Sequence, residues 1–471
     1  MSRSLASLLG AVRGGPGFEL VGDGAVEIVD ITLDSREVGP GTLFSCVPGA
    51  VHDGHDFAAA AVAAGAAAIL VERILPLDVP QVLTASTRAL TGWVAAAVFD
   101  HPCDALTMVG VTGTNGKTTT SQLIGDVLRS CGRRVEVLGT LSGRNTTPEA
   151  PTLQRQLAHW RDGGIDTVVM EVSSHALALD RVAGAHFDVA VFTNLGRDHL
   201  DLHHTIEQYF AAKARLFERA LSDRGVVNID DVHGRLLFDA RPIEMTGFSM
   251  RDVGNLVVTA TSHSYTWRGV RVSVGIGGHY NAMNSLAAAE ACAALGESDD
   301  AIAAGLAEAR PVPGRLEPIV AGQQFAVLVD YAHTPDGLAE ALRAMRDASA
   351  GKRVIVVFGC GGDRDRDKRP EMGAVAASLA DVVVVTSDNP RSEDPLAIIN
   401  AIVAGVPGDY RERVVTEPDR QLAIATALHR ASSGDVVLIA GKGHETTQTI
   451  GDRVVPFDDR VVARALLEAS R

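Results

Sequence analysis

The sequence predicts an α/β protein of about three domains, and three observations support this prediction. The chain has 471 residues, which at about 150 residues per domain is enough for roughly three domains. Hydrophobic residues make up 46% of the chain and charged residues 21%, as in folded domains rather than disordered chains. Short runs rich in valine and isoleucine recur, and helix-like segments follow them. This alternation is typical of α/β folds with parallel sheets.

Seven apolar runs are the clearest predicted strands. They are continuous rather than alternating, which suits strands that are buried on both faces of a parallel sheet. They cover residues 107–113, 166–174, 188–194, 326–333, 353–359, 381–389 and 435–443. Ligands of open parallel sheets bind beyond the carboxyl ends of the strands. Most of these runs end in polar motifs, so we expect the functional residues there.

Two proline-containing segments mark the predicted domain boundaries. His101-Pro102 precedes a glycine-rich loop, and the segment 311–314 follows an alanine-rich helical stretch. We therefore expect domains at residues 1–100, 101–312 and 313–471. The central domain would hold a parallel sheet like that of P-loop ATPases, and the last domain a Rossmann-like sheet.

Charge and cysteine content exclude several classes of function. The net charge of −15 argues against non-specific binding to nucleic acid or to anionic membranes. Five cysteines without a C-x-x-C pair argue against a disulfide framework or a cysteine-based zinc site, and favour a reducing compartment.

The apolar segments near the N-terminus do not predict a membrane protein. The run at residues 57–71 is shorter than the roughly 20 residues that a membrane span needs, so we expect a buried helix that leads into a strand. Residues 5–12 lack a clear signal-peptide cleavage site after them and are expected to form an amphipathic helix. We therefore expect a cytoplasmic protein that is not inserted in a membrane.

A glycine-rich segment at residues 109–120 has the character of a phosphate-binding loop. It follows a predicted strand, opens a helical segment and reads VGVTGTNGKTTT. Backbone N–H groups of such a loop and the start of the helix bind phosphate. Lys117 is placed to reach the β- and γ-phosphates, and the Thr118 hydroxyl to bind Mg²⁺. The usual first glycine of this motif would fall at Val111, so the spacing departs from the common pattern.

Acidic and histidine residues close the next two predicted strands. Glu171 ends the first of them and could hold Mg²⁺ through oxygen. His199 lies between Asp198 and Asp201 in the segment after the second strand, and we interpret it as a functional residue. Lys213 lies in an apolar helical segment and would, taken alone, be interpreted as a surface lysine with a buried stem.

Three central segments resemble motifs of the Mur ligase family, the ATP-dependent amide-forming enzymes of peptidoglycan precursor synthesis. They are GTNGKTT at 113–119, NLGRDHLD at 194–201 and YFAAKARLF at 209–217. Within the family, the chain is most similar to the members that add the third residue to the UDP-N-acetylmuramoyl dipeptide. The resemblance covers nearly the whole chain. The segments that match elsewhere are 33–36, 40–44, 51–57, 145–148, 171–181, 330–336, 359–365, 388–391 and 441–445.

The resemblance implies a UDP-binding first domain, an ATP-binding catalytic central domain and a C-terminal domain that binds the amino acid. The implied ATP-binding residues are Gly113, Thr114, Asn115, Gly116, Lys117, Thr118, Thr119, Asn284, Arg315 and Asp330. Those for the UDP-muramoyl peptide are Leu33, Ser35, Asn145, Thr146, Thr147, Ser173 and Arg181. Leu179 stands where some members have glutamine, so one hydrogen bond to this substrate is missing or made elsewhere. An alternative role for Asn284 is to cap a helix or turn.

The resemblance also implies the mechanism. The dipeptide carboxylate attacks the γ-phosphate of ATP to form an acyl phosphate, and the amine of the incoming amino acid then displaces phosphate. Both groups that react in the first step are anionic, so Lys117 and Mg²⁺ must neutralise charge. The implied catalytic residues are Lys117, Glu171, His199 and Lys213. The implied metal ligands are Thr118, Glu171, His199 and Lys213, the last as a carbamate formed with CO₂.

The motif at residues 388–391, Asp-Asn-Pro-Arg, is that of the diaminopimelate-adding members. Arg391 can form a two-pronged contact with the distal carboxylate of diaminopimelate, which lysine lacks. The implied diaminopimelate-binding residues are Arg364, Asp388, Asn389, Arg391, Gly441 and Glu445. We expect meso-2,6-diaminopimelate to be the substrate, although the motif does not distinguish it from the LL isomer.

Several alternatives remain at this point. The chain could add LL-diaminopimelate or lysine, or it could be a catalytically silent relative that binds nucleotide. Ligases that extend folate or cyanophycin fit less well, because the first domain and the segment 145–148 are complete. A P-loop motor or GTPase would need switch segments and a strand-borne Asp for Mg²⁺. We expect a monomer whose partners are ATP, UDP-N-acetylmuramoyl dipeptide and diaminopimelate, with no nucleic acid.

Overall fold

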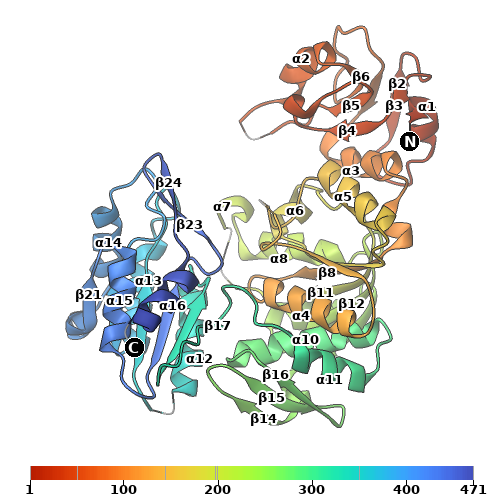
Figure 1. Cartoon of the computed structure of the whole chain (residues 1–471). Coiled ribbons are helices and arrows are strands. Elements are labelled where there is room, and N and C mark those ends of the chain that lie inside the picture. The colour runs from red at the N-terminus through yellow and green to blue at the C-terminus, as the bar shows by residue number, and fades with distance from the viewer. Residues whose placement is uncertain are drawn as a thin grey trace. The chain divides into compact units, whose positions relative to one another are not determined.

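A computed structural model describes residues 2–49, 51–143, 145–196, 198, 200–349 and 351–469, without the side chains of residues 200 and 201. The chain forms two compact units. The first comprises Met1–Phe248 and Glu290–Glu297, and the second comprises Ser249–Ala289 and Ser298–Arg471. Each unit contains two main sheets, which Figure 1 shows. The predicted domain boundaries near residues 100 and 312 fall in connections between sheets, and they stay a prediction.

The N-terminal sheet of the first unit has five strands. Its order is β2 (Phe18–Val21), β7 (Gln81–Thr84), β6 (Ala66–Val71), β5 (Thr42–Ser45) and β4 (Asp30–Thr32). The pairs are parallel except β2 with β7. The helices of this part are α1 (Leu5–Gly10), α2 (Ala58–Ala63) and α3 (Thr87–Val98), and a two-stranded pair joins β1 (Arg3–Ser4) to β3 (Glu27–Ile28). The apolar run 57–71 thus forms helix α2 and strand β6, as predicted, but the helix is not buried as a whole, because only Ala58 and Ala61 of α2 are buried.

The central sheet of the first unit is parallel throughout. Its order is β13 (Glu244–Phe248), β12 (Ser222–Asn228), β11 (Phe187–Phe192), β8 (Thr107–Thr112), β10 (Thr167–Glu171) and β9 (Val135–Leu138). Its helices are α4 (Lys117–Ser130), α5 (Ala150–Asp162), α6 (Ser174–Ala178), α7 (Leu200–His203), α8 (Ile206–Ala214) and α9 (Val232–Ala240). After β8 the chain forms β9 and β10 on one side of β8, and then β11 on its other side. The loop after β8 therefore lies where the strand order reverses, which is the place where ligands of such sheets bind.

The second unit begins with an antiparallel sheet of β14 (Gly254–Val258), β15 (His263–Trp267) and β16 (Val270–Val274). The helices α10 (His279–Ala294) and α11 (Asp299–Glu308) follow it. The C-terminal part of α10 belongs to the first unit.

The main sheet of the second unit has the order β17 (Glu317–Pro318), β18 (Ala326–Asp330), β22 (Val436–Ala440), β19 (Val354–Phe358), β20 (Val382–Val385) and β21 (Val414–Thr416). All pairs are parallel except β17 with β18. Helices α12 (Pro335–Ala348), α13 (Lys368–Leu379) and α14 (Pro395–Ala404) pack on one face, and α15 (Arg420–Arg430) and α16 (Asp459–Ala469) on the other (Figure 1). A hairpin of β23 (Thr447–Ile450) and β24 (Arg453–Pro456) precedes α16.

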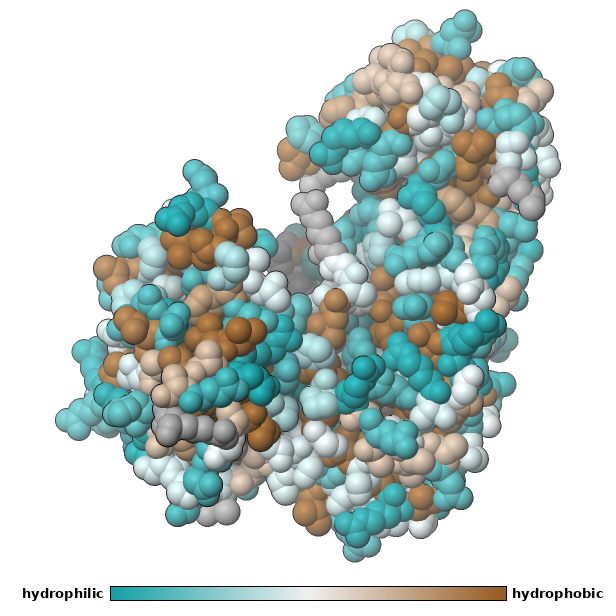
Figure 2. Space-filling model, in the orientation of Figure 1, coloured by the Kyte–Doolittle hydropathy of each residue, from teal (hydrophilic) through white to brown (hydrophobic). Residues whose placement is uncertain are grey.

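The exposed surface mixes polar and apolar residues on the face shown in Figure 2. Large apolar side chains are exposed on several elements, among them Phe18, Leu236 and Leu396. Scattered apolar side chains are normal on protein surfaces and do not by themselves mark a binding site. Among the described residues, no helix has both the length and the apolar character that a membrane crossing requires.

Candidate active site

The predicted phosphate loop connects β8 to α4. Gly113 has a φ of 151° and Gly116 a φ of 85°, a region that side chains with a Cβ rarely adopt. A Cβ at Gly113 would also clash with the Thr193 hydroxyl. Because Lys117 is the first residue of α4, the loop presents the N-terminal end of a helix, which favours an anionic ligand.

The end of β11 holds this loop in place. The backbone N–H of Thr114 donates to the Asn194 carbonyl oxygen at 2.9 Å. The N–H of Asn115 donates to the Asn194 side-chain oxygen at 2.9 Å, and the Thr193 hydroxyl donates to the Asn115 carbonyl oxygen at 2.6 Å. The segment that follows β11 therefore holds the phosphate loop that follows β8.

Lys117 lies over the loop. Its ammonium donates to the carbonyl oxygens of Gly113 and Thr114, each at 2.9 Å. The charge is thus held at the loop that precedes α4. This arrangement can neutralise the phosphate groups of a nucleotide.

Glu171, at the end of β10, is 2% exposed. One of its oxygens accepts from the Thr118 hydroxyl at 3.1 Å, and the other from the Thr140 N–H at 2.8 Å. A Cβ on Gly139 would clash with the carboxylate, so glycine permits this approach. The structure therefore brings together Thr118 and Glu171, two of the predicted metal ligands.

Lys213, on α8, is 1% exposed. It donates to the Gly113 carbonyl oxygen at 2.6 Å and lies 4.6 Å from the centre of the Tyr209 ring. Burial lowers the pKa of Lys213 well below its usual 10.5, and the nearby charge of Lys117 lowers it further. The interpretation as a surface lysine, which the segment alone would suggest, is wrong. The buried amine lies beside the phosphate loop, 100 residues away in sequence.

The fourth predicted catalytic residue, His199, lies outside the described residues. Among the residues that are described, no three His, Cys, Asp or Glu side chains gather as a metal site would require. Any metal site here therefore depends on other oxygen donors, such as Thr118, or on residues beyond this set.

Four predicted substrate residues meet beside Glu171. The buried Thr147 hydroxyl donates to the Glu171 carbonyl oxygen at 2.9 Å and accepts from the Ser173 N–H at 3.1 Å. Arg181 donates to the Thr147 carbonyl oxygen at 3.2 Å. The Thr146 hydroxyl lies 3.1 Å from that of Thr140, another neighbour of Glu171. Of the remaining residues in this set, Asn145 lies in the same loop, and Leu33 and Ser35 follow β4.

The other predicted ATP-binding residues belong to the second unit. Asn284 lies inside α10 rather than at its end, and donates to the Asn281 side-chain oxygen at 3.0 Å. Asp330 ends β18, and its carboxylate accepts from the N–H groups of Leu316 and Ala332, each at 2.8 Å. Burial raises the pKa of Asp330, although Arg315 and these two hydrogen bonds oppose the shift.

The predicted diaminopimelate residues follow three adjacent strands of the second unit. Arg364 follows β19, the segment 388–391 follows β20, and the segment 441–445 follows β22. Since these strands are neighbours and parallel, their following segments meet at one edge of the sheet. The Asn389 amide donates to a Glu445 carboxylate oxygen at 2.8 Å.

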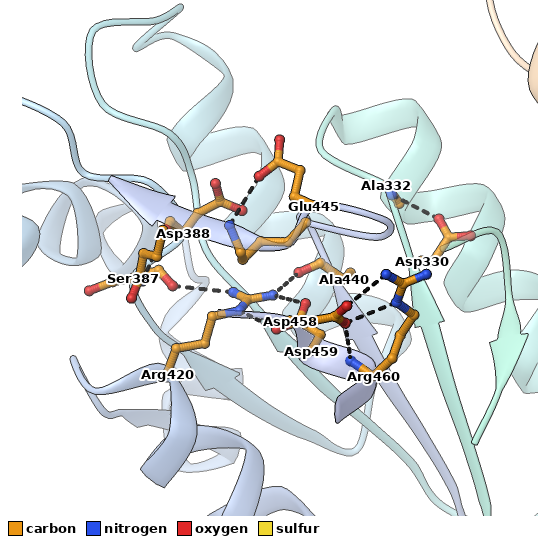
Figure 3. Close-up of polar contacts among 12 residues, drawn as sticks. Asp330, Ala332, Ser387, Asp388, Arg420, Ala440, Glu445, Asp458, Asp459 and Arg460 are labelled. Atoms are coloured by element: carbon orange, nitrogen blue, oxygen red, sulfur yellow. Dashed lines mark hydrogen bonds and ion pairs between the residues drawn. The ribbon is translucent and has the colours of Figure 1, made fainter. Parts of the chain in front are cut away.

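Arg391 and Gly441 complete this cluster. The guanidinium of Arg391 donates to the Gly362 carbonyl oxygen at 2.7 Å. Gly441 has a φ of 111°, and a Cβ there would approach an Asp388 oxygen to 2.6 Å. Figure 3 shows one Glu445 oxygen in a polar contact and the other directed away from the residues drawn.

Lys442 is a part of this cluster that sequence reasoning missed. Its buried ammonium donates to Glu445 at 3.0 Å, to the Thr447 carbonyl oxygen at 2.7 Å and, more weakly, to Asn389 at 3.4 Å. Its place between two glycines after an apolar strand is the signal that could have identified it.

Comparison with known proteins identifies the family of this chain. The Mur ligase middle domain matches residues 111–292, the Mur ligase glutamate ligase domain matches 314–443, and the catalytic domain of the Mur ligase family matches 27–97. A UDP-N-acetylmuramoyl-L-alanyl-D-glutamate–2,6-diaminopimelate ligase of Geobacillus kaustophilus is 45% identical over 96% of this chain and 97% of its own. The chain belongs to the Mur ligase family.

Other Mur ligases agree with this assignment. A ligase of the same name from Streptomyces coelicolor is 43% identical over 95% of this chain and 94% of its own. A solved structure of a ligase of that name has a TM-score of 0.72 and 32% identity, and covers 100% of this chain and 99% of its own.

The structure of MurF from Thermotoga maritima in complex with ADP has a TM-score of 0.63 at 22% identity, with 93% of this chain and 97% of its own covered. At this identity the likeness concerns the fold alone. The predicted family and the predicted three-domain α/β fold class are confirmed.

Proposed function

We propose that this Mur ligase uses ATP to join 2,6-diaminopimelate to UDP-N-acetylmuramoyl-L-Ala-D-Glu, with release of ADP and phosphate. The observation that carries the proposal is the similarity over nearly the whole chain to ligases named for this reaction, at 40–46% identity. The chain also keeps Arg391 in a cluster with Asn389 and Glu445, where a distal carboxylate and ammonium could both be bound.

The first step joins two anions, the dipeptide carboxylate and the γ-phosphate. The loop at Gly113–Gly116, the start of α4 and the Lys117 ammonium together offer positive potential to the phosphates. Thr147, Ser173 and Arg181 lie beside Glu171, and we assign them to the muramoyl peptide. The attacking carboxylate would then approach the nucleotide loop on the same side of the central sheet.

The residues around Glu171 fit Mg²⁺, which prefers oxygen ligands. The Thr118 hydroxyl and the Glu171 carboxylate supply such oxygens 3.1 Å apart. When bound, Mg²⁺ would offset the negative charge of the β- and γ-phosphates. Lys213 as an ammonium could not contribute, whereas its carbamate would add a carboxylate-like ligand. His199 completes the proposed set.

The environment of Lys213 suits carbamate formation. CO₂ reacts with a neutral amine: a C–N bond forms, the amine loses a proton, and a carbamate anion results. Because burial and Lys117 lower the pKa of Lys213, the neutral amine is populated at lower pH than for an ordinary lysine. Lys117 would then face an anion instead of a second cation.

Arg391 provides a test of the amino-acid site. We expect Arg391→Lys to raise the KM for diaminopimelate roughly 10- to 100-fold, as expected for the loss of a charged hydrogen bond of about 1.5–3 kcal/mol. The KM values for ATP and for the UDP-dipeptide should stay the same. Arg430→Lys, at the exposed end of α15, is the control. An unchanged KM for diaminopimelate in Arg391→Lys would contradict the assignment.

The function is tested by phosphate release with ATP, Mg²⁺ and UDP-N-acetylmuramoyl-L-Ala-D-Glu. Parallel reactions contain meso-diaminopimelate, LL-diaminopimelate, L-lysine or no amino acid. Release that requires a diaminopimelate isomer is expected, and the preferred isomer, which we propose to be meso, is read from the same set. Release with lysine alone would reject the role of Arg391. No release in any reaction would favour a silent relative.

We further propose that the boundaries between the three domains lie near residues 100 and 312, and that the protein is a monomer. Analytical ultracentrifugation of the purified chain tests the monomer. Limited proteolysis near the two boundaries tests the domain division, because exposed connections are the preferred sites of cleavage.

A further inference from the structure

Arg420 and Asp459 form a fully buried ion pair on the second unit. Arg420 is the first residue of α15 and Asp459 the first residue of α16. The guanidinium donates to both carboxylate oxygens at 2.7 Å, and both side chains are 0% exposed. A buried ion pair is often no more stabilising than a well-packed apolar pair. Stability is therefore a weak explanation for its presence.

The same guanidinium also binds two backbone carbonyl oxygens. It donates to Ser387 at 3.2 Å and to Ala440 at 2.9 Å, and Figure 3 shows these contacts with the Asp459 pair. Ala440 ends β22, and Ser387 comes shortly after β20. These two strands are not neighbours, because β19 lies between them. One side chain therefore ties together the ends of two strands across a third.

The residues that follow these two anchored carbonyls form the proposed diaminopimelate site. Asp388, Asn389 and Arg391 come directly after Ser387, and the segment 441–445 comes directly after Ala440. The hydrogen bond between Asn389 and Glu445 joins the two segments and depends on their spacing. We propose that Arg420 is a positioning residue that sets this spacing and hence the affinity for the amino-acid substrate. The inference rests on the proposed assignment of this site.

A second arginine–aspartate pair at the same sheet, in which the arginine is partly exposed, offers a control. Arg353 donates to Asp435 at 2.6 and 3.1 Å. These residues directly precede β19 and β22, so this pair ties the amino ends of the strands. Its loss should affect stability but not the segments at the carboxyl ends.

The test compares wild type, Arg420→Lys, the double variant Arg420→Met with Asp459→Leu, and Arg353→Lys. KM for each substrate, kcat and Tm are measured. We expect about a tenfold or larger rise in the KM for diaminopimelate in both Arg420 variants, because loosening the support of a site weakens binding. The KM for ATP and for the UDP-dipeptide should change less than about twofold. The double variant should keep a Tm near that of wild type, because an apolar pair can replace a buried ion pair.

Three results would overturn the inference. The first is a double variant with a near-normal Tm and an unchanged KM for diaminopimelate. The second is an equal rise of this KM in Arg353→Lys. The third is unfolding of both Arg420 variants while Arg353→Lys stays folded, because Arg420 would then serve the fold and not the spacing of the loops. Wild-type enzyme that does not ligate diaminopimelate would instead reject the proposed function, so the two failures are distinguishable.

Discussion

Replacing Lys117 by methionine is expected to lower kcat for phosphate release by about 10²- to 10³-fold, the usual cost of removing one preorganised group that stabilises developing charge. Its ammonium lies within 2.9 Å of two loop carbonyl oxygens at the start of α4, where the nucleotide phosphates are expected. Without it, the carboxylate and the γ-phosphate must approach with less charge neutralised. Discontinuous phosphate assays at saturating substrate concentrations measure this change in kcat.

The control for Lys117 is Lys352→Met, which removes an exposed lysine of the second unit. Its kcat should match that of wild type. Circular dichroism should show that both variants are folded, because neither lysine belongs to the hydrophobic core. A Lys117→Met enzyme that keeps more than about a tenth of the wild-type kcat would contradict a role in charge neutralisation.

Replacing Lys213 by alanine is expected to lower kcat at least about 100-fold, because the variant loses the proposed carbamate and with it a charged group that helps to stabilise the transition state. A small carboxylic acid such as acetate should restore part of this activity, since it can occupy the space and supply the anion. Lys213→Arg, which keeps a cation but cannot be carbamylated in the same way, should stay inactive. Full activity in Lys213→Ala would reject the carbamate.

The carbamate also predicts a dependence on CO₂ and on pH. Wild-type activity should fall in CO₂-depleted buffer and return with bicarbonate. Below the lowered pKa of Lys213 the amine is protonated, so the carbamate and the activity should be lost as the pH falls. In CO₂-free solution the native state binds fewer protons than the unfolded state between that lowered pKa and 10.5, so stability should rise with pH in this window. Activity independent of CO₂ would contradict the carbamate.

The sequence predicts the buried strands well. Each of the seven continuous apolar runs overlaps one strand, such as β8 and β22, because strands covered on both faces need apolar residues throughout. The antiparallel strands β14–β16 are not among these runs, since β15 alternates between buried and half-buried residues and so lacks a continuous apolar pattern. The predicted run 166–174 continues beyond β10, which ends at Glu171. Its last residues belong to the site.

Candidate-site residues that lie in short sequence motifs can be predicted from the sequence. Those whose role depends on contacts between distant parts of the chain cannot. Lys117 lies in a glycine-rich loop whose chemistry is readable from spacing, whereas the role of Arg391 is implied by the resemblance of its motif to the family. The approach of Lys213 to Gly113 joins residues 100 positions apart, which no local pattern shows. Arg420 looks like an ordinary surface cation in the sequence, because Asp459, the carboxylate that pairs with it, lies 39 residues away. Only the folded chain brings each charge to its partner.

The most direct test of the proposed reaction uses UDP-N-acetylmuramoyl-L-Ala-D-Glu with an isotopic oxygen label in the reacting carboxylate. The acyl-phosphate route transfers one carboxylate oxygen to phosphorus, and attack by the amine of diaminopimelate breaks the C–O bond. The released phosphate should therefore carry one labelled oxygen for each tripeptide formed, as measured by mass spectrometry. Unlabelled phosphate accompanying tripeptide formation would contradict the acyl phosphate and the roles assigned to Lys117 and Lys213.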